Sequence, residues 1–143
     1  MSLRLSIEVL RKMPMFRPLS EPRLRVIAMS GNVLSYLPGE RIAEQGEEGD
    51  AAFIVLSGAV DVLVRTPDGE KRVARLGEGE IVGEMAMLTG NPRSTAMAAH
   101  GDLTVLRLEK DATMALLREF PEMAIEFIRI IAGRLEATNQ LVG

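Results

Sequence analysis

The chain has no cysteine and no tryptophan, and its 143 residues include only one tyrosine, four phenylalanines and one histidine. Without cysteine there is no disulfide, no thiol nucleophile and no cysteine metal site, which fits a cytoplasmic protein. A histidine base or metal ligand would rest on His100 alone, and its His-Gly-Asp setting indicates a turn. Because aromatic side chains are scarce, a flat ligand would have to stack on aliphatic side chains or on arginine.

Long apolar runs are also missing, so the sequence predicts no membrane-spanning helix and no membrane partner. Charged residues interrupt the apolar positions near the N-terminus, which excludes a secretory signal peptide there. The 17 basic and 20 acidic residues give a net charge of −3, and no basic face stands out. This balance argues against nucleic-acid binding by this chain alone. Apolar residues make up 47% and charged residues 26%, as in an ordinary globular protein.

The pattern of apolar residues divides one predicted domain, 1–143, into three parts. Helical spacing covers residues 1–31, short strands between turn residues cover 32–110, and helical spacing returns over 111–143. One strand shows a regular alternation of apolar residues: Val60, Val62 and Val64. Short strands at close intervals favour an antiparallel sandwich or a barrel-like roll.

One stretch, residues 82–95, combines features that suit an anionic ligand. A predicted strand ends at Gly83, Glu84 follows, and an apolar helical turn leads through Gly-Asn-Pro to Arg93. Glycine lets a ligand come close to the backbone, the first amides of a helical turn are free donors, and arginine matches phosphate oxygens. A ligand with one small anion and a neighbouring sugar hydroxyl fits this set; the alternative is a strand-turn-strand with a surface ion pair. The candidate ligand-binding residues are Gly83, Glu84, Met85, Ala86, Arg93, Ser94 and Thr95.

This stretch resembles the phosphate-binding cassette of cyclic nucleotide-binding domains. In that family the glutamate accepts a hydrogen bond from the ribose 2′-hydroxyl, the arginine pairs with the cyclic phosphate, and the next residue adds a hydroxyl. The corresponding residues here are Glu84, Arg93 and Ser94. The resemblance implies a mainly β fold, an eight-stranded antiparallel, jelly-roll-like β-roll with N-terminal helices and a long C-terminal helix. It also implies cyclic AMP or cyclic GMP as the ligand, with no other cofactor and no metal.

The last predicted helix starts at Pro121 and is apolar on more than one side. A seam with alternating spacings of four and three consists of Ile128, Ala132, Leu135, Asn139 and Val142. Such a helix has two faces to bury, one on the β-roll and one elsewhere. The second face predicts a homodimer through paired C-terminal helices. The alternative is a helix that lies flat on its own domain.

The stretch 132–139 is similar to the dimer helix of bacterial catabolite activator proteins, which reach the adenine with a Thr-Ser pair. Thr138 matches the threonine, and Asn139 replaces the serine while keeping a donor and an acceptor. Arg134 stands at the position of an arginine that approaches the cassette glutamate. A surface or seam role for these three residues is the alternative. If the dimer forms, the Thr138-Asn139 pair favours cyclic AMP over cyclic GMP, while Ser94 fits either nucleotide.

We therefore predict a cyclic nucleotide-binding regulatory module, not an enzyme, that signals by moving its C-terminal helix as a lid. A metal-dependent enzyme on a similar β-roll would need several histidines, and the sequence shows no nucleophile with a paired base. The remaining alternative is a ligand-free interaction or dimerisation domain on the same fold. Because the chain stops soon after the predicted dimer helix, we expect an effector protein or an output domain outside this chain.

Overall fold

A computed structural model describes residues 2–142, with the side chains of residues 3–137. The helices are α1 (Ser2–Lys12), a short 3₁₀ helix η1 (Pro14–Phe16), α2 (Glu21–Met29), α3 (Glu84–Thr89), α4 (Lys110–Glu119) and α5 (Pro121–Val142). The strands are β1 (Asn32–Tyr36), β2 (Arg41–Ala43), β3 (Ala51–Thr66), β4 (Gly69–Leu76), β5 (Ile81–Val82) and β6 (Ala96–Glu109). The predicted antiparallel β fold with flanking helices and a long C-terminal helix is confirmed.

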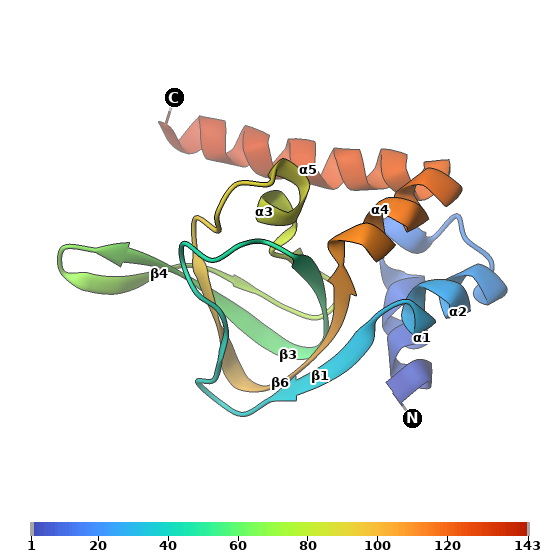
Figure 1. Ribbon diagram of the computed structural model, residues 1–143, viewed down its shortest axis with the longest axis horizontal. Helices are drawn as coiled ribbons and strands as arrows, with labels where there is room; N and C mark the ends of the chain where they lie inside the picture. The colour runs from blue at the N-terminus through green and yellow to red at the C-terminus, as the bar shows by residue number, and fades with distance from the viewer. Residues whose placement is uncertain (1, 143) are drawn as a thin grey trace.

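All strand pairs are antiparallel, and the sheet has the order β1-β6-β3-β4, with β2 added to β6 and β5 added to β3. Two long strands, β3 and β6, form the centre of the roll (Figure 1). Their pairing shifts register twice between Val55 and Ala59, so each strand bends without ending. The expected count of eight is not confirmed: the described residues form six strands, because bulged segments stay joined in one strand.

The first half of β3 separates two hydrophobic cores. Residues 51–56 are all buried, and their side chains alternate between the two sides of the sheet. Ala51, Phe53 and Val55 fill the inside of the roll, whereas Ala52, Ile54 and Leu56 pack against the helical layer. The α1–η1–α2 region covers that outer side (Figure 1). The chain therefore has one sheet with apolar residues on both faces at this point.

The C-terminal helix α5 lies across one end of the roll, above α3 (Figure 1). Its Met123 and Phe127 are buried in the helical core, while Ile128 and Leu135 are 64% and 49% exposed. One of the two predicted faces therefore packs on the domain, and the covering of the other stays a prediction. Among residues 2–142, no helix combines the length and the hydrophobicity needed to cross a bilayer.

The start of α4 differs by one position from the division expected at residue 111. The helix begins at Lys110, with Glu109 at the N-cap position, so the sheet ends one residue earlier than a boundary after residue 110 implies. The Glu109 carbonyl accepts a hydrogen bond from the Thr113 hydroxyl at 2.9 Å. The backbone therefore passes directly from β6 into the helix without a separate loop.

Candidate functional site

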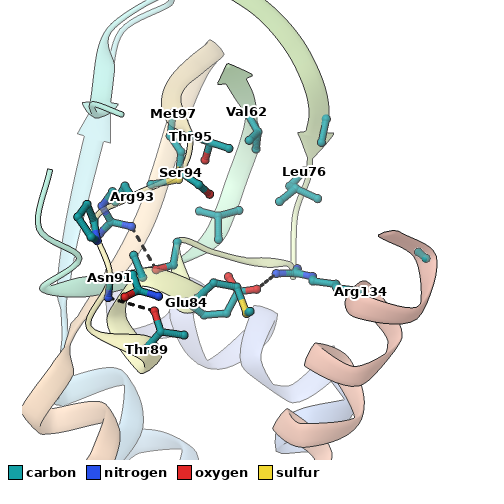
Figure 2. A pocket seen from close by; sticks show the side chains of 17 residues that line it. Val62, Leu76, Glu84, Thr89, Asn91, Arg93, Ser94, Thr95, Met97 and Arg134 are labelled. Atoms are coloured by element: carbon teal, nitrogen blue, oxygen red, sulfur yellow. Dashed lines mark hydrogen bonds and ion pairs between the residues drawn. The ribbon is translucent and has the colours of Figure 1, made fainter. Parts of the chain in front are cut away.

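A cavity of about 600 Å³ opens between α3, the β3–β4 hairpin, the segment after α3 and helix α5 (Figure 2). This volume is within the range of small-molecule sites. Its lining residues are Val62, Ala74, Leu76, Val82, Gly83, Glu84, Met85, Ala86, Thr89, Asn91, Pro92, Arg93, Ser94, Thr95, Met97, Arg134 and Ala137. All seven residues predicted for the cassette thus lie at one cavity.

The backbone at Gly83 turns sharply between β5 and α3. Its φ of 77° lies in the left-handed region, which residues other than glycine rarely adopt. A Cβ at this position would stand 2.7 Å from Nη1 of Arg93 and 3.2 Å from the end of Met97. Gly83 therefore leaves room for the Arg93 guanidinium at the cavity and, at the same time, starts α3.

Arg93 is the most desolvated cation of the cavity, with 6% of its surface exposed. Its Nη1 donates to the Gly83 carbonyl at 3.1 Å, and its Nη2 donates to the Ala51 carbonyl at 2.7 Å. The guanidinium also lies over the Phe53 ring, 5.8 Å from the centroid. These three contacts fix the orientation of the fork before any ligand is bound.

Burial lowers the pKa of Arg93 from its ordinary value, and the carboxylates of Asp50 and Glu47 act in the opposite direction. The lowered pKa means that the protein environment replaces the lost hydration only in part. The acceptors of these two hydrogen bonds from Arg93 are neutral carbonyls. A bound anion would compensate this charge directly, which is what a phosphate site requires.

The backbone of Arg93 is held by a segment that precedes β3. The Gly46 amide donates to the Arg93 carbonyl at 2.7 Å, and the Arg93 amide donates to the Glu47 carbonyl at 2.8 Å. Nearby, a Cβ on Gly49 would come within 2.4 Å of the Ala86 Cβ, so glycine allows this segment to pack on α3. The position of Arg93 thus depends on residues more than forty positions earlier in the chain.

Glu84 is the buried acid of the cavity, with 3% of its surface exposed. Its Oε1 forms an ion pair with Nη1 of Arg134 from α5 (Figure 2). Nη2 of Arg134 donates to the Ile81 carbonyl at 2.7 Å. One arginine of the C-terminal helix therefore contacts both the cassette and the strand that leads into it.

The side of the cavity formed by the hairpin is apolar, and Val62 and Leu76 lie away from Arg93 in the close view (Figure 2). We call Val62, Ala74 and Leu76 the hairpin wall. Val62 pairs with Ala74 on β4 and with Met97 on β6, so all three strands contribute to one apolar surface. The cavity thus offers a cation, an acid and an apolar surface at separate places.

Other predicted residues have varied positions. Met85 is 39% exposed, Ala86 is buried, Ser94 is exposed and Thr95 is half-buried, and all line the cavity. Thr138 and Asn139 are on α5, but their side chains lie outside the described residues. His100 does not line the cavity; its Nδ1 is 3.6 Å from Oδ2 of Asp61. The described residues contain no group of histidine and acidic side chains arranged to hold a metal ion.

Sequence reasoning missed the contacts that orient Arg93 and the members of the hairpin wall. Phe53 and the Ala51 carbonyl belong to a strand 40 residues away, and nothing in the local pattern links them to an arginine. A signal existed for Val62, because its alternating strand has one buried face. That alternation gives the face but not the strand opposite to it.

Comparison with known proteins adds a family match. The family model for the cyclic nucleotide-binding domain matches residues 33–120. The chain is 24% identical over 133 residues to the CRP-like cAMP-activated global transcriptional regulator of Mycobacterium tuberculosis, covering 92% of this chain and 59% of that protein. It is 32% identical over 99 residues to the cAMP-dependent protein kinase type II regulatory subunit of Drosophila melanogaster, covering 69% of this chain and 26% of that protein.

Among solved structures, the catabolite activator protein of Thermus thermophilus matches with a TM-score of 0.83 and 30% identity. That match covers 90% of this chain and 61% of the Thermus chain. The chain thus spans about three fifths of the Mycobacterium regulator and a quarter of the Drosophila subunit. The similarity covers the roll and its flanking helices.

Proposed function

We propose, from the premise that this chain belongs to the cyclic nucleotide-binding domain family, that its cavity binds a cyclic nucleotide as a regulatory signal. The observation that carries the proposal is that a desolvated Arg93 and a buried Glu84 line the same cavity. Arg93 would hold the cyclic phosphate, together with the Met85 and Ala86 amides, and Glu84 would accept from the ribose 2′-hydroxyl. The hairpin wall would contact the base.

We favour cyclic AMP over cyclic GMP as the ligand. The hairpin wall carries no side-chain hydrogen-bonding group, so Ser94, Thr95 and α5 would supply the polar contacts to the base. Thr138 and Asn139 would approach the adenine from the end of α5. Titration calorimetry with both nucleotides tests the function and the preference together. Saturable binding supports the sensor, and the ratio of the two affinities identifies the base.

Absence of heat and of a thermal shift with both nucleotides would favour the alternative, a ligand-free interaction domain. In that case the exposed side of α5 would be its working surface. Because Glu84 and Arg93 are both held at the cavity, the sensor is the better supported of the two.

The ion pair between Glu84 and Arg134 supports a signalling role for α5. A ribose hydroxyl that bonds to Glu84 would share the carboxylate with Arg134, so binding would bear directly on how the helix is held. The ligand can shift α5 only if it binds one helix position more tightly than the other. An effector protein or an output domain outside this chain would receive that movement.

Replacing Glu84 by glutamine should weaken binding of cyclic AMP about tenfold, because a hydrogen bond to a charged group contributes about 1.5 kcal/mol or more. Glutamine keeps the size of the side chain, so the cavity should keep its shape. Calorimetry on the variant measures the effect. The matched control is Glu78→Gln, an exposed acid in the turn before β5 and outside the cavity lining. Equal affinities for Glu84→Gln and the parent protein would show that Glu84 does not contact the nucleotide.

The exposed apolar face of α5 supports the proposed homodimer. Ile125, Ile128 and Leu135 are 52%, 64% and 49% exposed, and Ala132 between them is exposed too. A soluble helix rarely leaves such a continuous apolar stripe uncovered. A second copy of the same helix, packed along residues 128–135, would cover it symmetrically.

Ile128→Glu should convert the dimer to a monomer, because it places a charge from each copy within the apolar seam. Sedimentation velocity on parent and variant measures the change in mass. The control is Val26→Glu on α2, which introduces the same charge at a residue that is 48% exposed. A parent protein that is already monomeric, or an unchanged dimer in Ile128→Glu, would contradict the proposed interface.

A further inference from the structure

An exposed arginine outside the cavity connects the hairpin to the segment that holds Arg93. We call residues 41–50 the bridge segment; it starts with β2 and ends at β3. In Figure 1 it runs from the side of the β3–β4 hairpin to the region of α3. Arg41, its first residue, does not line the cavity.

The Arg41 guanidinium forms ion pairs with two carboxylates. Its Nε and Nη2 donate to Glu44 at 3.0 and 2.9 Å, and its Nη1 and Nη2 donate to Glu70 at 2.9 and 2.7 Å. Glu44 belongs to the bridge segment, whereas Glu70 is the second residue of β4, 29 positions away. Both contacts use two donors and two acceptor oxygens, so they fix direction as well as distance.

Hydrogen bonding with Arg41 is the main cause of a lowered pKa at both Glu44 and Glu70. Because the folded-state pKa of each carboxyl lies below its unfolded value, its contribution to stability is complete when the pH is above the unfolded pKa. That contribution is lost as the pH falls through the folded pKa. Both acids are therefore charged at neutral pH, where the contact with Arg41 is complete.

A second contact ties the same two parts together. The Arg65 amide on β3 donates to Oε1 of Gln45 at 2.9 Å, so the bridge segment also touches the other strand of the hairpin. Immediately after Gln45, Gly46 and Glu47 hold the backbone of Arg93 on both sides. The hairpin that carries the hairpin wall is therefore joined to Arg93 through residues 41–47 of the bridge segment.

We propose that Arg41 is a positioning residue for nucleotide binding, which sets the distance between the hairpin wall and Arg93 by clamping Glu44 and Glu70. The inference rests on the proposed function, because the two ends of the connection are the base and phosphate sides of the same cavity. Exposed ion pairs contribute little to folding stability, and Arg41 has 35% of its side chain exposed. Its loss should therefore change ligand binding more than thermal stability.

The test compares Arg41→Gln with Arg75→Gln. Arg75 pairs with Asp61 across the same hairpin and has a side-chain exposure of 37%, but its ion pair stays within the hairpin. Arg41→Gln should weaken binding of cyclic AMP about fivefold to tenfold, with a thermal midpoint close to that of the parent. Arg75→Gln should stay within about twofold of the parent. Arg41→Lys, which keeps the charge but not the fork, should fall between the two.

A double-mutant cycle distinguishes the clamp from a general charge effect. If Arg41 acts through Glu70, then Glu70→Gln weakens binding in the parent protein but has no further effect in Arg41→Gln. Equal affinities for Arg41→Gln and the parent, equal losses in Arg41→Gln and Arg75→Gln, or additive losses in the double variant would each overturn the proposal.

Hydrogen exchange gives a reading that needs no nucleotide. The Gly46 amide donates to the Arg93 carbonyl, and the Arg93 amide donates to the Glu47 carbonyl. Peptides that contain these two amides should exchange faster in Arg41→Gln than in the parent, and at the parent rate in Arg75→Gln. A parent protein that binds no cyclic nucleotide would reject the proposed function, while the exchange result still decides whether Arg41 orders Arg93. Unchanged exchange in these peptides would overturn the positioning role.

Discussion

Arg93→Ala is expected to weaken binding of cyclic AMP by about a hundredfold or more, because a charge-assisted hydrogen bond contributes up to about 3 kcal/mol and each 1.4 kcal/mol is tenfold. The guanidinium is already oriented by the Gly83 and Ala51 carbonyls and by Phe53, so the ligand does not have to order it. Its removal therefore takes away a prepared anion site. Calorimetry, with the ligand in large excess, measures the loss.

Two controls separate lost binding from lost folding. Arg93→Lys keeps the charge without the fork, and it should bind more weakly than the parent but better than Arg93→Ala. Arg129→Ala removes an exposed arginine on α5 that forms an ion pair with Glu126, one turn earlier in the same helix. It should bind like the parent. Undiminished binding by a folded Arg93→Ala protein would place the phosphate elsewhere.

Gly58→Ala is expected to give the largest loss of stability, about 3 kcal/mol, because it combines left-handed backbone strain with an overpacked contact. Gly58 has a φ of 90°, and a Cβ there would lie 2.2 Å from the Asp102 carbonyl oxygen. Since that neighbour is backbone of β6, it cannot rotate away as a side chain could. Thermal unfolding of the two proteins should show a midpoint lower by about 10 °C in the variant.

The chain offers a matched control for this prediction. Gly101 also has a positive φ, 72°, but a Cβ there would meet nothing within 4 Å. Gly101→Ala carries the backbone strain without the clash, so it should cost about 1 kcal/mol. Similar midpoints for Gly58→Ala and Gly101→Ala would show that the strand contact yields and that the clash argument is wrong.

The cassette could be predicted from the sequence because its parts are contiguous. A glycine, an acid, a short apolar helix and an arginine within 82–95 are connected by local geometry, and local geometry is readable from spacing. The two-sided character of α5 was readable for the same reason, since its apolar positions repeat along one helix. Periodicity alone predicted only an antiparallel β fold; the β-roll with flanking helices, which the resemblance implied, is confirmed.

The parts that could not be predicted depend on contacts between distant segments. The Ala51 carbonyl and the bridge segment reach Arg93 only because β3 and β6 lie side by side, and pairing register is not written in any short stretch. The strand count of eight is not confirmed for a related reason. Turn residues such as Gly58 indicate an end of a strand, yet here a bulge accommodates the glycine and β3 continues.

Residues 51–56 are buried alternately in the two hydrophobic cores, so the roll and the helical layer share this strand as one wall. Neither side can lose its packing without exposing half of that strand to water, so the two layers should unfold in a single cooperative step. A ligand held at the cavity would then protect α1 and α2 against opening, although neither helix lines the cavity. Ligand binding at the cavity would therefore reduce local opening of helices on the opposite side of the molecule.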